Sequence, residues 1–446
     1  MNATTSHGRR DLVAAPTALL ASGMVRRCAL SGAALAAALA GGAFAQDTAA
    51  PKAAQPASAE KPAAEQPAKV DAAAARKAAL AALEARYVVG PAAADDFGLR
   101  IVWQTEPLAT KDAAGSLVTP GSDSYWFGDT AGSIVRVRRD NGETVWRSST
   151  NLGLEKIVSI EHLPAGKDDN VYVLTDLGGV ALDATTGNLV RRTRYSQLPS
   201  NVPAVYGPSM IYGTRTGLCS WFQYGTGYNW RATTLGGHVV APVTVSGQLA
   251  LVGSTNGTVL CMDAASAGVM WTRRLSAGVE SAIAVDGDAC FVAGRDQSLW
   301  AFDLMRGRVL WQYFTQTPLL HPPVRLADGL YLQIPGEGLV SFTPLPADKP
   351  DGEVRWKSKA KGDVIGRLGT ELMAWDHATR TLTAVDAGTG RVIREAQLPN
   401  AESIEFTQPV DGDLVVMSKD GSVERLEPLN RASIGGSSAA MTPAAP

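Results

Sequence analysis

Six polar residues of this chain could meet in the folded protein and bind a ligand. Five of them are separated by about forty residues or twice that: Asn201, Glu280, His321, Asp363 and Glu405. The sixth, His238, is two residues before the matching position of its repeat, Val240. Carboxylate oxygens bind hard cations, and imidazole groups bind metals or polar molecules. The alternative is that each residue begins a strand at a solvated edge, where polar side chains are ordinary. The fold decides between the two.

Aromatic residues cluster in the segment 221–230, which a Gly-rich turn interrupts. Tyr224 and Tyr228 flank this turn, and we expect them to be exposed. Exposed aromatic side chains are typical of contact sites for proteins or glycans. Strand alternation directs half of such residues inward, so core packing is the alternative.

Motifs of catalysis and metal binding are absent from the sequence. It contains no His-Glu-x-x-His, Cys-x-x-Cys, Gly-x-Ser-x-Gly or P-loop pattern. Asp286-Gly287-Asp288 and Asp411-Gly412-Asp413 could suggest calcium ligands, but neither precedes a ligand loop and both favour a hairpin turn. We therefore predict no catalytic residue, no metal site and no cofactor.

The elements that position these residues follow from a repeated phrase, Asp-x-x-x-Gly-x-x-x-Trp. Asp303–Trp311 is a full copy, and Asp386–Arg394 is a copy with the Trp replaced. The last position of the phrase recurs about every forty residues, at Trp103, Trp146, Arg191, Trp230, Trp271, Trp311, Trp356 and Arg394. The Asp can accept hydrogen bonds from turn amides, and the Gly tolerates a left-handed backbone. A fixed period in this range indicates a repeat architecture.

Each repeat contains short apolar and β-branched runs separated by turns, which indicates four antiparallel strands. Four strands in a repeat of this length are typical of a propeller blade. The last repeat lacks a fourth strand, and Leu99–Gln104 is a fourth strand without the three that should precede it. We therefore predict an all-β, eight-bladed β-propeller of four-stranded antiparallel blades over residues 96–430, closed by the N-terminal strand.

The turn phrases resemble those of the PQQ-like repeat β-propeller family. Leu182–Gly187 and Ala384–Gly390 carry the resemblance, which extends over roughly residues 96–430. It implies the propeller fold and says little about activity, because the signature residues belong to turns and packing. Within this family, the non-enzymatic propeller subunit of the outer-membrane β-barrel assembly machinery is similar in size and blade count.

Two features separate the chain from members of that family. Its quinone-dependent alcohol dehydrogenases are longer and hold a pair of adjacent cysteines against the cofactor, whereas this chain has no Cys-Cys pair. The assembly-machinery subunit is a lipoprotein, but here Cys28 follows Val25-Arg26-Arg27, which is no lipobox. PQQ binding is therefore not expected. The other cysteines are expected to be buried apolar residues.

The termini differ in composition from the repeats. Residues 1–45 form an export signal with an upstream extension, since an apolar stretch follows Arg26-Arg27 and ends at the A-x-A site Ala43–Ala45. A retained membrane anchor is the alternative, and translation could begin at Met1 or at Met24. Residues 46–95 are an Ala/Pro-rich linker that could form a short helix. Residues 431–446 are expected to be a disordered tail.

The charge of the exported chain argues against a nucleic-acid partner. Removing residues 1–45 takes away four Arg and one Asp, so the 41 basic and 43 acidic residues become 37 and 42. No basic patch is visible in the sequence.

We therefore expect an exported, non-catalytic scaffold for protein–protein interaction in the periplasm or cell envelope. The resemblance implies a role in outer-membrane protein assembly, an envelope protein as partner and peripheral membrane association through that partner. Two alternatives remain open. One is a quinone-dependent dehydrogenase or another propeller enzyme, with its site at an acidic channel mouth formed by Glu280, Asp363 and Glu405. The other is a glycan-binding module that uses Tyr224 and Tyr228. The oligomeric state is left open.

Overall fold

The computed structural model describes residues 72–108, 115–120, 123–150, 152, 155–165 and 168–429. The predicted export signal, the linker up to residue 71 and the predicted C-terminal tail lie outside the described residues. Among the described residues, those up to residue 82 and those from residue 83 onward belong to two different compact units.

Helix α1 (Ala72–Glu84) lies in the Ala-rich segment that could form a short helix. Alanine has the highest intrinsic helix propensity, which explains why this sequence is helical. Its side chains include Leu80 and Leu83, which are 60% and 40% exposed. Of the helices in the described ranges, none combines the length and the apolar character that a bilayer crossing needs.

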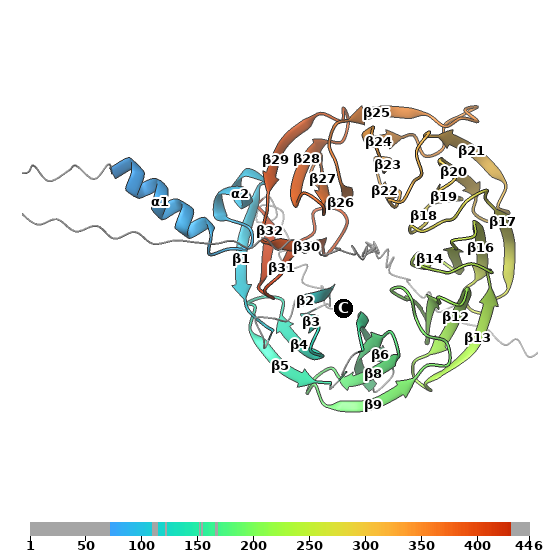
Figure 1. Ribbon diagram of the computed structural model, residues 1–446, viewed down its shortest axis with the longest axis horizontal. Coiled ribbons are helices and arrows are strands. Elements are labelled where there is room, and N and C mark those ends of the chain that lie inside the picture. Colours follow the sequence, from blue (N-terminus) through green and yellow to red (C-terminus); the bar gives the residue numbers. More distant parts are fainter. Residues whose placement is uncertain are drawn as a thin grey trace, which may run out of the picture. The chain divides into compact units, whose positions relative to one another are not determined.

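Eight four-stranded antiparallel sheets form a ring of blades, which confirms the predicted eight-bladed propeller (Figure 1). Each blade begins with its innermost strand and, except for the last, ends with its outermost strand.

Blades 1 to 4 have the following strands, from the innermost outward. Blade 1 has β2 (Gly115–Pro120), β3 (Ser124–Asp129), β4 (Ser133–Arg138) and β5 (Thr144–Ser149); blade 2 has β6 (Ile157–Ala165), β7 (Asp168–Thr175), β8 (Gly178–Asp183) and β9 (Leu189–Arg194); blade 3 has β10 (Ala204–Tyr206), β11 (Ser209–Gly213), β12 (Leu218–Gln223) and β13 (Tyr228–Thr234); blade 4 has β14 (Thr244–Ser246), β15 (Leu249–Gly253), β16 (Thr258–Asp263) and β17 (Val269–Arg274).

Blades 5 to 8 continue the ring. Blade 5 has β18 (Ala284–Asp286), β19 (Ala289–Gly294), β20 (Ser298–Asp303) and β21 (Val309–Phe314); blade 6 has β22 (Val324–Leu326), β23 (Gly329–Ile334), β24 (Gly338–Phe342) and β25 (Val354–Ser358); blade 7 has β26 (Asp363–Leu368), β27 (Glu371–Asp376), β28 (Thr381–Asp386) and β29 (Val392–Gln397); blade 8 has β30 (Ala401–Phe406), β31 (Leu414–Ser418), β32 (Val423–Pro428) and β1 (Leu99–Thr105).

The hydrophobic core lies between neighbouring blades. The second strands, such as β15 and β19, are buried along their whole length because a blade covers each face. The core between blades 4 and 5, for example, joins Leu251 and Trp271 to Val292 and Phe302. Cys219, Cys261 and Cys290 are buried free thiols in these layers, as expected from the sequence.

The repeated phrase joins each blade to the next. Asp303 accepts hydrogen bonds from the turn amides of Met305 and Arg306 at 3.1 and 2.8 Å. The turn then presents the carbonyl of Leu304 to the indole nitrogen of Trp271 in the preceding blade, at 2.8 Å. Gly307 has a φ of +64°, and a Cβ atom there would lie 2.5 Å from the Trp271 ring. The Trp of one phrase therefore needs the Asp and Gly of the next.

The N-terminal strand closes the ring as predicted. Strand β1 pairs with β32 in antiparallel register, from Leu99 opposite Pro428 to Thr105 opposite Val423. Beyond this sheet, Arg139 of blade 1 forms a 2.7 Å ion pair with Asp413 of blade 8. Closure leaves no blade with an unfilled position.

Residues 84–98, which we call the junction segment, pack between blades 7 and 8 ahead of β1. Helix α2 (Pro91–Asp96) has Pro at its first turn, where the missing N–H costs nothing. Val88, Val89 and Phe97 are buried in one cluster with Trp375 and Ile404. The packed chain therefore begins before residue 95, where the sequence placed the end of the linker.

Candidate functional site

The six predicted mouth residues do not form one cluster. Asn201 is buried, and its Oδ1 accepts a hydrogen bond from the Gly213 amide at 2.9 Å. Its Nδ2 donates to the carbonyls of Ala241 at 2.5 Å and Val239 at 3.3 Å. These bonds use both ends of the amide to join blade 3 to blade 4, so the role of Asn201 is structural.

Two of the predicted carboxylates have basic partners. Glu280 pairs with Arg295, from the turn between β19 and β20, at 2.8 Å. Asp363 at the start of β26 contacts Nδ1 of His321 at 2.9 Å, and this hydrogen bond raises the pKa of His321 above its ordinary value. His238 is exposed. The charges of these carboxylates are therefore largely compensated, which does not favour the binding of a cation by this set of residues.

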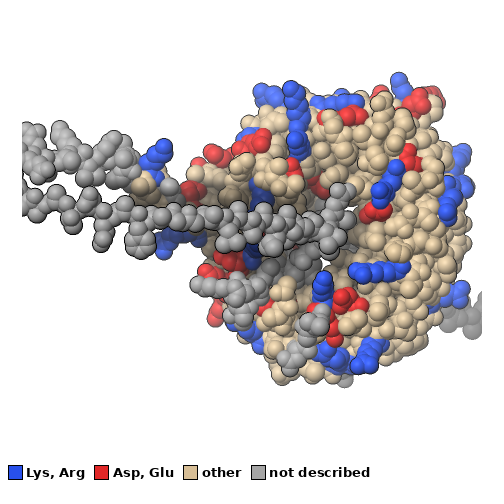
Figure 2. Space-filling model, viewed as in Figure 1, with Lys and Arg blue, Asp and Glu red and all other residues tan. Residues whose placement is uncertain are grey.

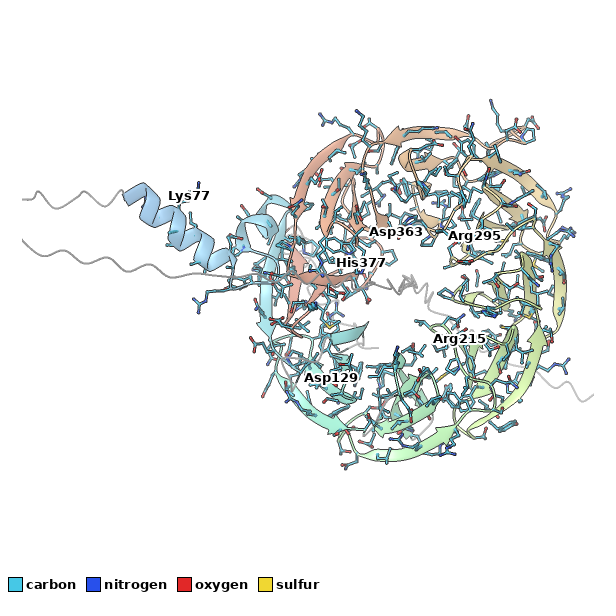
Figure 3. All side chains as sticks on the ribbon, in the orientation of Figure 1. Lys77, Asp129, Arg215, Arg295, Asp363 and His377 are labelled. Carbon is cyan, nitrogen blue, oxygen red and sulfur yellow. The ribbon has the colours of Figure 1, made fainter. Side chains whose placement is uncertain are left out.

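Cations lie around the same mouth. Figure 3 labels Asp363, His377, Arg215 and Arg295 on the inner side of the ring. Arg215, Arg295 and His377 belong to the turns between the second and third strands of their blades. Among the residues that the structure describes, no three His, Cys, Asp or Glu side chains are arranged to hold a metal ion.

The predicted position of Glu405 at a strand start is wrong. A strand start at Glu405 would place the following turn after Val410, but β30 (Ala401–Phe406) ends one residue after Glu405. A longer connection, residues 407–413, follows the strand and shifts the register. Glu405 is therefore near the end of β30, opposite Val415. It does not join Asp363 at the mouth.

Glu161 is the counterpart of Glu405 that the sequence analysis missed. Both lie on innermost strands, and both follow a β-bulge near the strand start with the same register. Burial raises the pKa of each carboxyl to about 7, and in Glu161 a hydrogen bond from Ser159 partly offsets this effect. Blades 2 and 8 thus each carry one weakly acidic carboxyl on the innermost strand.

The two predicted rim tyrosines differ in exposure. Tyr224 is buried at 6% exposure, its hydroxyl donates to the Gly207 carbonyl at 3.1 Å, and its ring packs on Tyr172. The expectation that Tyr224 is exposed is therefore wrong, because the ring fills the core between blades 2 and 3. Tyr228 is 53% exposed at the start of β13.

Tyr228 is part of a larger apolar surface that sequence reasoning missed. We define the outer wall as the exposed apolar residues of β9, β13 and β17: Leu189 at 61%, Val190 at 55%, Tyr228 at 53%, Val269 at 50% and Met270 at 48% exposure. In β9 and β17 a bulge inserts Val190 and Met270, so two successive side chains are exposed. The apolar pairs Leu189-Val190 and Val269-Met270 are visible in the sequence, but a pair at the matching position also begins β21 and β29, so the pair alone does not identify this surface.

The outer wall is also basic. Strands β9, β13 and β17 contain no Asp or Glu, and they expose the basic residues Arg192, Arg194, Arg231, Arg273 and Arg274. Figure 2 shows Lys and Arg along the periphery of the ring on the side of β13 and β17. An apolar surface with positive charge favours partners that carry apolar and acidic groups.

Comparison with known proteins agrees with this architecture. A family model described as outer membrane protein assembly factor BamB matches residues 130–227 and 212–345. No curated protein matches the chain. Among solved structures, BamB from Moraxella catarrhalis has a TM-score of 0.58 at 19% identity, covering 74% of this chain and 97% of that one. The computationally designed Ika8 protein has a TM-score of 0.58 at 13% identity, covering 72% and 98%.

The fold, the repeated phrase and the family match define a PQQ-like repeat β-propeller. Within that class, the chain is similar to the outer-membrane protein assembly factor BamB.

Proposed function

We propose that this chain is an exported, non-catalytic scaffold that binds a protein partner in the cell envelope during outer-membrane protein assembly. The match to the BamB family model is the observation that carries this proposal. The export signal expected at residues 1–45 supports a periplasmic or envelope location. The repeated phrase supports a scaffold role, since its Asp, Gly and Trp residues are used in joining the blades.

The outer wall is the proposed docking surface. Its partner is an extended protein segment with apolar and acidic side chains, for two reasons. The wall exposes Val269 and Met270 beside Arg273 without a carboxylate on the same strand. In addition, β9, β13 and β17 each end their sheet, so each has an edge on which an extended segment can pair.

Affinity capture after cross-linking in cells tests this docking surface. The exported chain and a variant with Val269→Glu and Met270→Glu are compared in envelope extracts. A control variant carries Val392→Glu and Ile393→Glu, which are at the matching positions of β29 and are 37% and 36% exposed. We expect a protein captured by the wild-type chain and the control to be lost from the wall variant. Equal capture by all three proteins would refute the docking surface.

A further inference from the structure

Two residues that are opposite each other in blade 8 each have a buried side-chain oxygen without a hydrogen-bond partner. Gln104 of β1 and Glu424 of β32 are directly opposite in the strand register. Such pairs lie on the same face of a sheet, with Cβ atoms about 4.5–5.5 Å apart. The Glu424 side chain is fully buried, and Oε1 of each residue has no hydrogen-bond partner within the described part of the chain.

The other atoms of both groups are fixed by the junction segment. Oε2 of Glu424 accepts hydrogen bonds from the amides of Val88 and Val89, both at 2.9 Å. Nε2 of Gln104 donates to the Arg86 carbonyl at 3.1 Å. Flipping the Gln104 amide would set its oxygen against that carbonyl, so Oε1 remains the atom that has no partner. With Glu424 ionised, its Oε1 and Oε1 of Gln104 would be two acceptors on opposite residues, with no hydrogen between them.

We propose that Glu424 is protonated in the folded protein, and that its Oε1–H donates a hydrogen bond to Oε1 of Gln104. This single proton completes a clasp that holds residues 86–89 in the junction between blades 7 and 8. Loss of the proton opens the clasp and releases the segment, which makes the closure of the ring sensitive to pH.

The surrounding charges agree with a neutral Glu424. Burial raises the pKa of Glu424 to about 7, and the bonds from Val89 and Val88 only partly offset this; the negative charge of Glu84 adds to the increase. Arg86, Arg380, Lys419 and Asp420 line a groove that Gln104 and Val88 also line. Of these, Arg380 pairs with Glu402 at 2.8 Å, and Asp420 accepts a bond from Ser418. The neighbouring strand β31 has no titratable residue.

The clasp lies where the repeated phrase lacks its Trp. Blade 7 has Arg394 at this position, and its guanidinium bonds the Asp96 carbonyl, lies 5.9 Å from the Phe97 ring and pairs with Glu371 at 2.5 Å. Between blades 7 and 8, the junction segment thus replaces the lock that a Trp provides elsewhere, which is the indole hydrogen bond from one blade to the turn of the next. A lock held by a carboxylic acid can respond to pH, whereas one held by an indole cannot.

The sign of the pH dependence follows from the direction of the shift. The folded pKa of Glu424 is raised, so the stabilisation is fully present below the ordinary Glu range and is lost as the pH rises through about 7. Once Glu424 is mostly ionised, each further pH unit lowers the population of the closed clasp relative to the open one by about tenfold.

Hydrogen exchange of the Val88 and Val89 amides in the full exported chain tests the proposal. Protection is measured at about pH 5.5 and about pH 8.5 and corrected for the intrinsic exchange rate. We expect protection of both amides to fall by tenfold or more at the higher pH in the wild-type chain. In Glu424→Gln, the side-chain amide can donate to Gln104 and still accept from both backbone amides, so protection should be independent of pH.

Glu405→Gln is the matched control, because Glu405 also has a raised pKa but is not a member of the proposed clasp. It should keep the wild-type response of Val88 and Val89. Protection that does not change with pH in the wild-type chain, or that changes equally in Glu424→Gln, would overturn the clasp. If Glu424→Gln does not fold, the carbon-13 shift of the wild-type Glu424 carboxyl decides: titration near 7 supports the clasp, and titration near 4.5 refutes it.

Discussion

At the residue scale, the repeated phrase acts across blades rather than within one. Trp146, Trp271 and Trp356 each donate an indole hydrogen bond to the turn of the following blade, at 2.8 to 2.9 Å. Blade 3 is an exception, since Trp221 of β12 makes the equivalent bond to Ala264 while Trp230 bonds Ser209. The spacing of Asp, Gly and Trp is therefore set by packing between neighbours.

Gly307→Ala tests this role of the phrase. The substitution forces a residue with a Cβ into a φ of +64° and against the Trp271 ring. Gly247→Ala is the control, since its φ is +57° but no atom lies within 4 Å of the added Cβ. Left-handed strain alone costs about 1–2 kcal/mol, so Gly307→Ala should lower the free energy of unfolding by clearly more than that. Equal losses in urea titrations of the two variants would contradict the lock.

Residue-scale errors of the sequence analysis have local causes. Asp363 does begin a strand, because β26 starts there and only a two-residue turn separates it from β27. Glu405 was misplaced because residues 407–413 lengthen the corresponding connection. The pairing of Gln104 with Glu424 could not be seen at all, since the two residues are far apart in the sequence and meet only through ring closure.

At the element scale, the junction segment is the part of the fold that the repeat pattern did not predict. It contains no copy of the phrase, and its Ala- and Pro-rich composition resembles that of the linker before it. Its burial depends on the missing Trp of blade 7, which leaves room for Phe97 beside Arg394. A segment that fills a gap in a repeat has no periodic signal of its own.

Truncation tests where the folded propeller begins. Deleting residues 46–83 should leave the melting temperature unchanged, since the junction segment remains. Deleting residues 46–98 removes buried Val88, Val89 and Phe97. At about 1.5–3 kcal/mol for each buried side chain, the loss is a large share of a typical stability of about 5–15 kcal/mol. The longer deletion should therefore unfold at much lower temperature, and equal melting temperatures would show that the segment does not stabilise the ring.

At the scale of the whole molecule, blade count and closure were predictable because each blade repeats the same turn chemistry. The single N-terminal strand and the three C-terminal strands could be matched by counting, and β1 does pair with β32. The outer wall was less visible, since its exposure depends on bulges in β9 and β17 that the sequence alone does not specify.

A quinone cofactor is not part of the proposed function. The chain has no adjacent cysteine pair to hold PQQ, and Cys219, Cys261 and Cys290 are buried in different strands. After incubation with PQQ and calcium and removal of free ligand, the protein should retain no quinone absorbance and reduce no dye with alcohols. Retained absorbance with turnover, lost in Asp363→Asn, would instead favour the enzyme.

The central claim is that this propeller supports outer-membrane protein assembly through its outer wall. The most direct measurement is the amount of β-barrel protein in the outer membrane of cells whose only copy is the wild-type chain, the Val269→Glu and Met270→Glu variant, the Val392→Glu and Ile393→Glu control, or no chain. We predict a reduced amount without the chain and with the wall variant, and a normal amount with the control at equal protein levels. A normal amount in cells that lack the chain would contradict the function itself, and a normal amount with the wall variant would contradict its proposed surface.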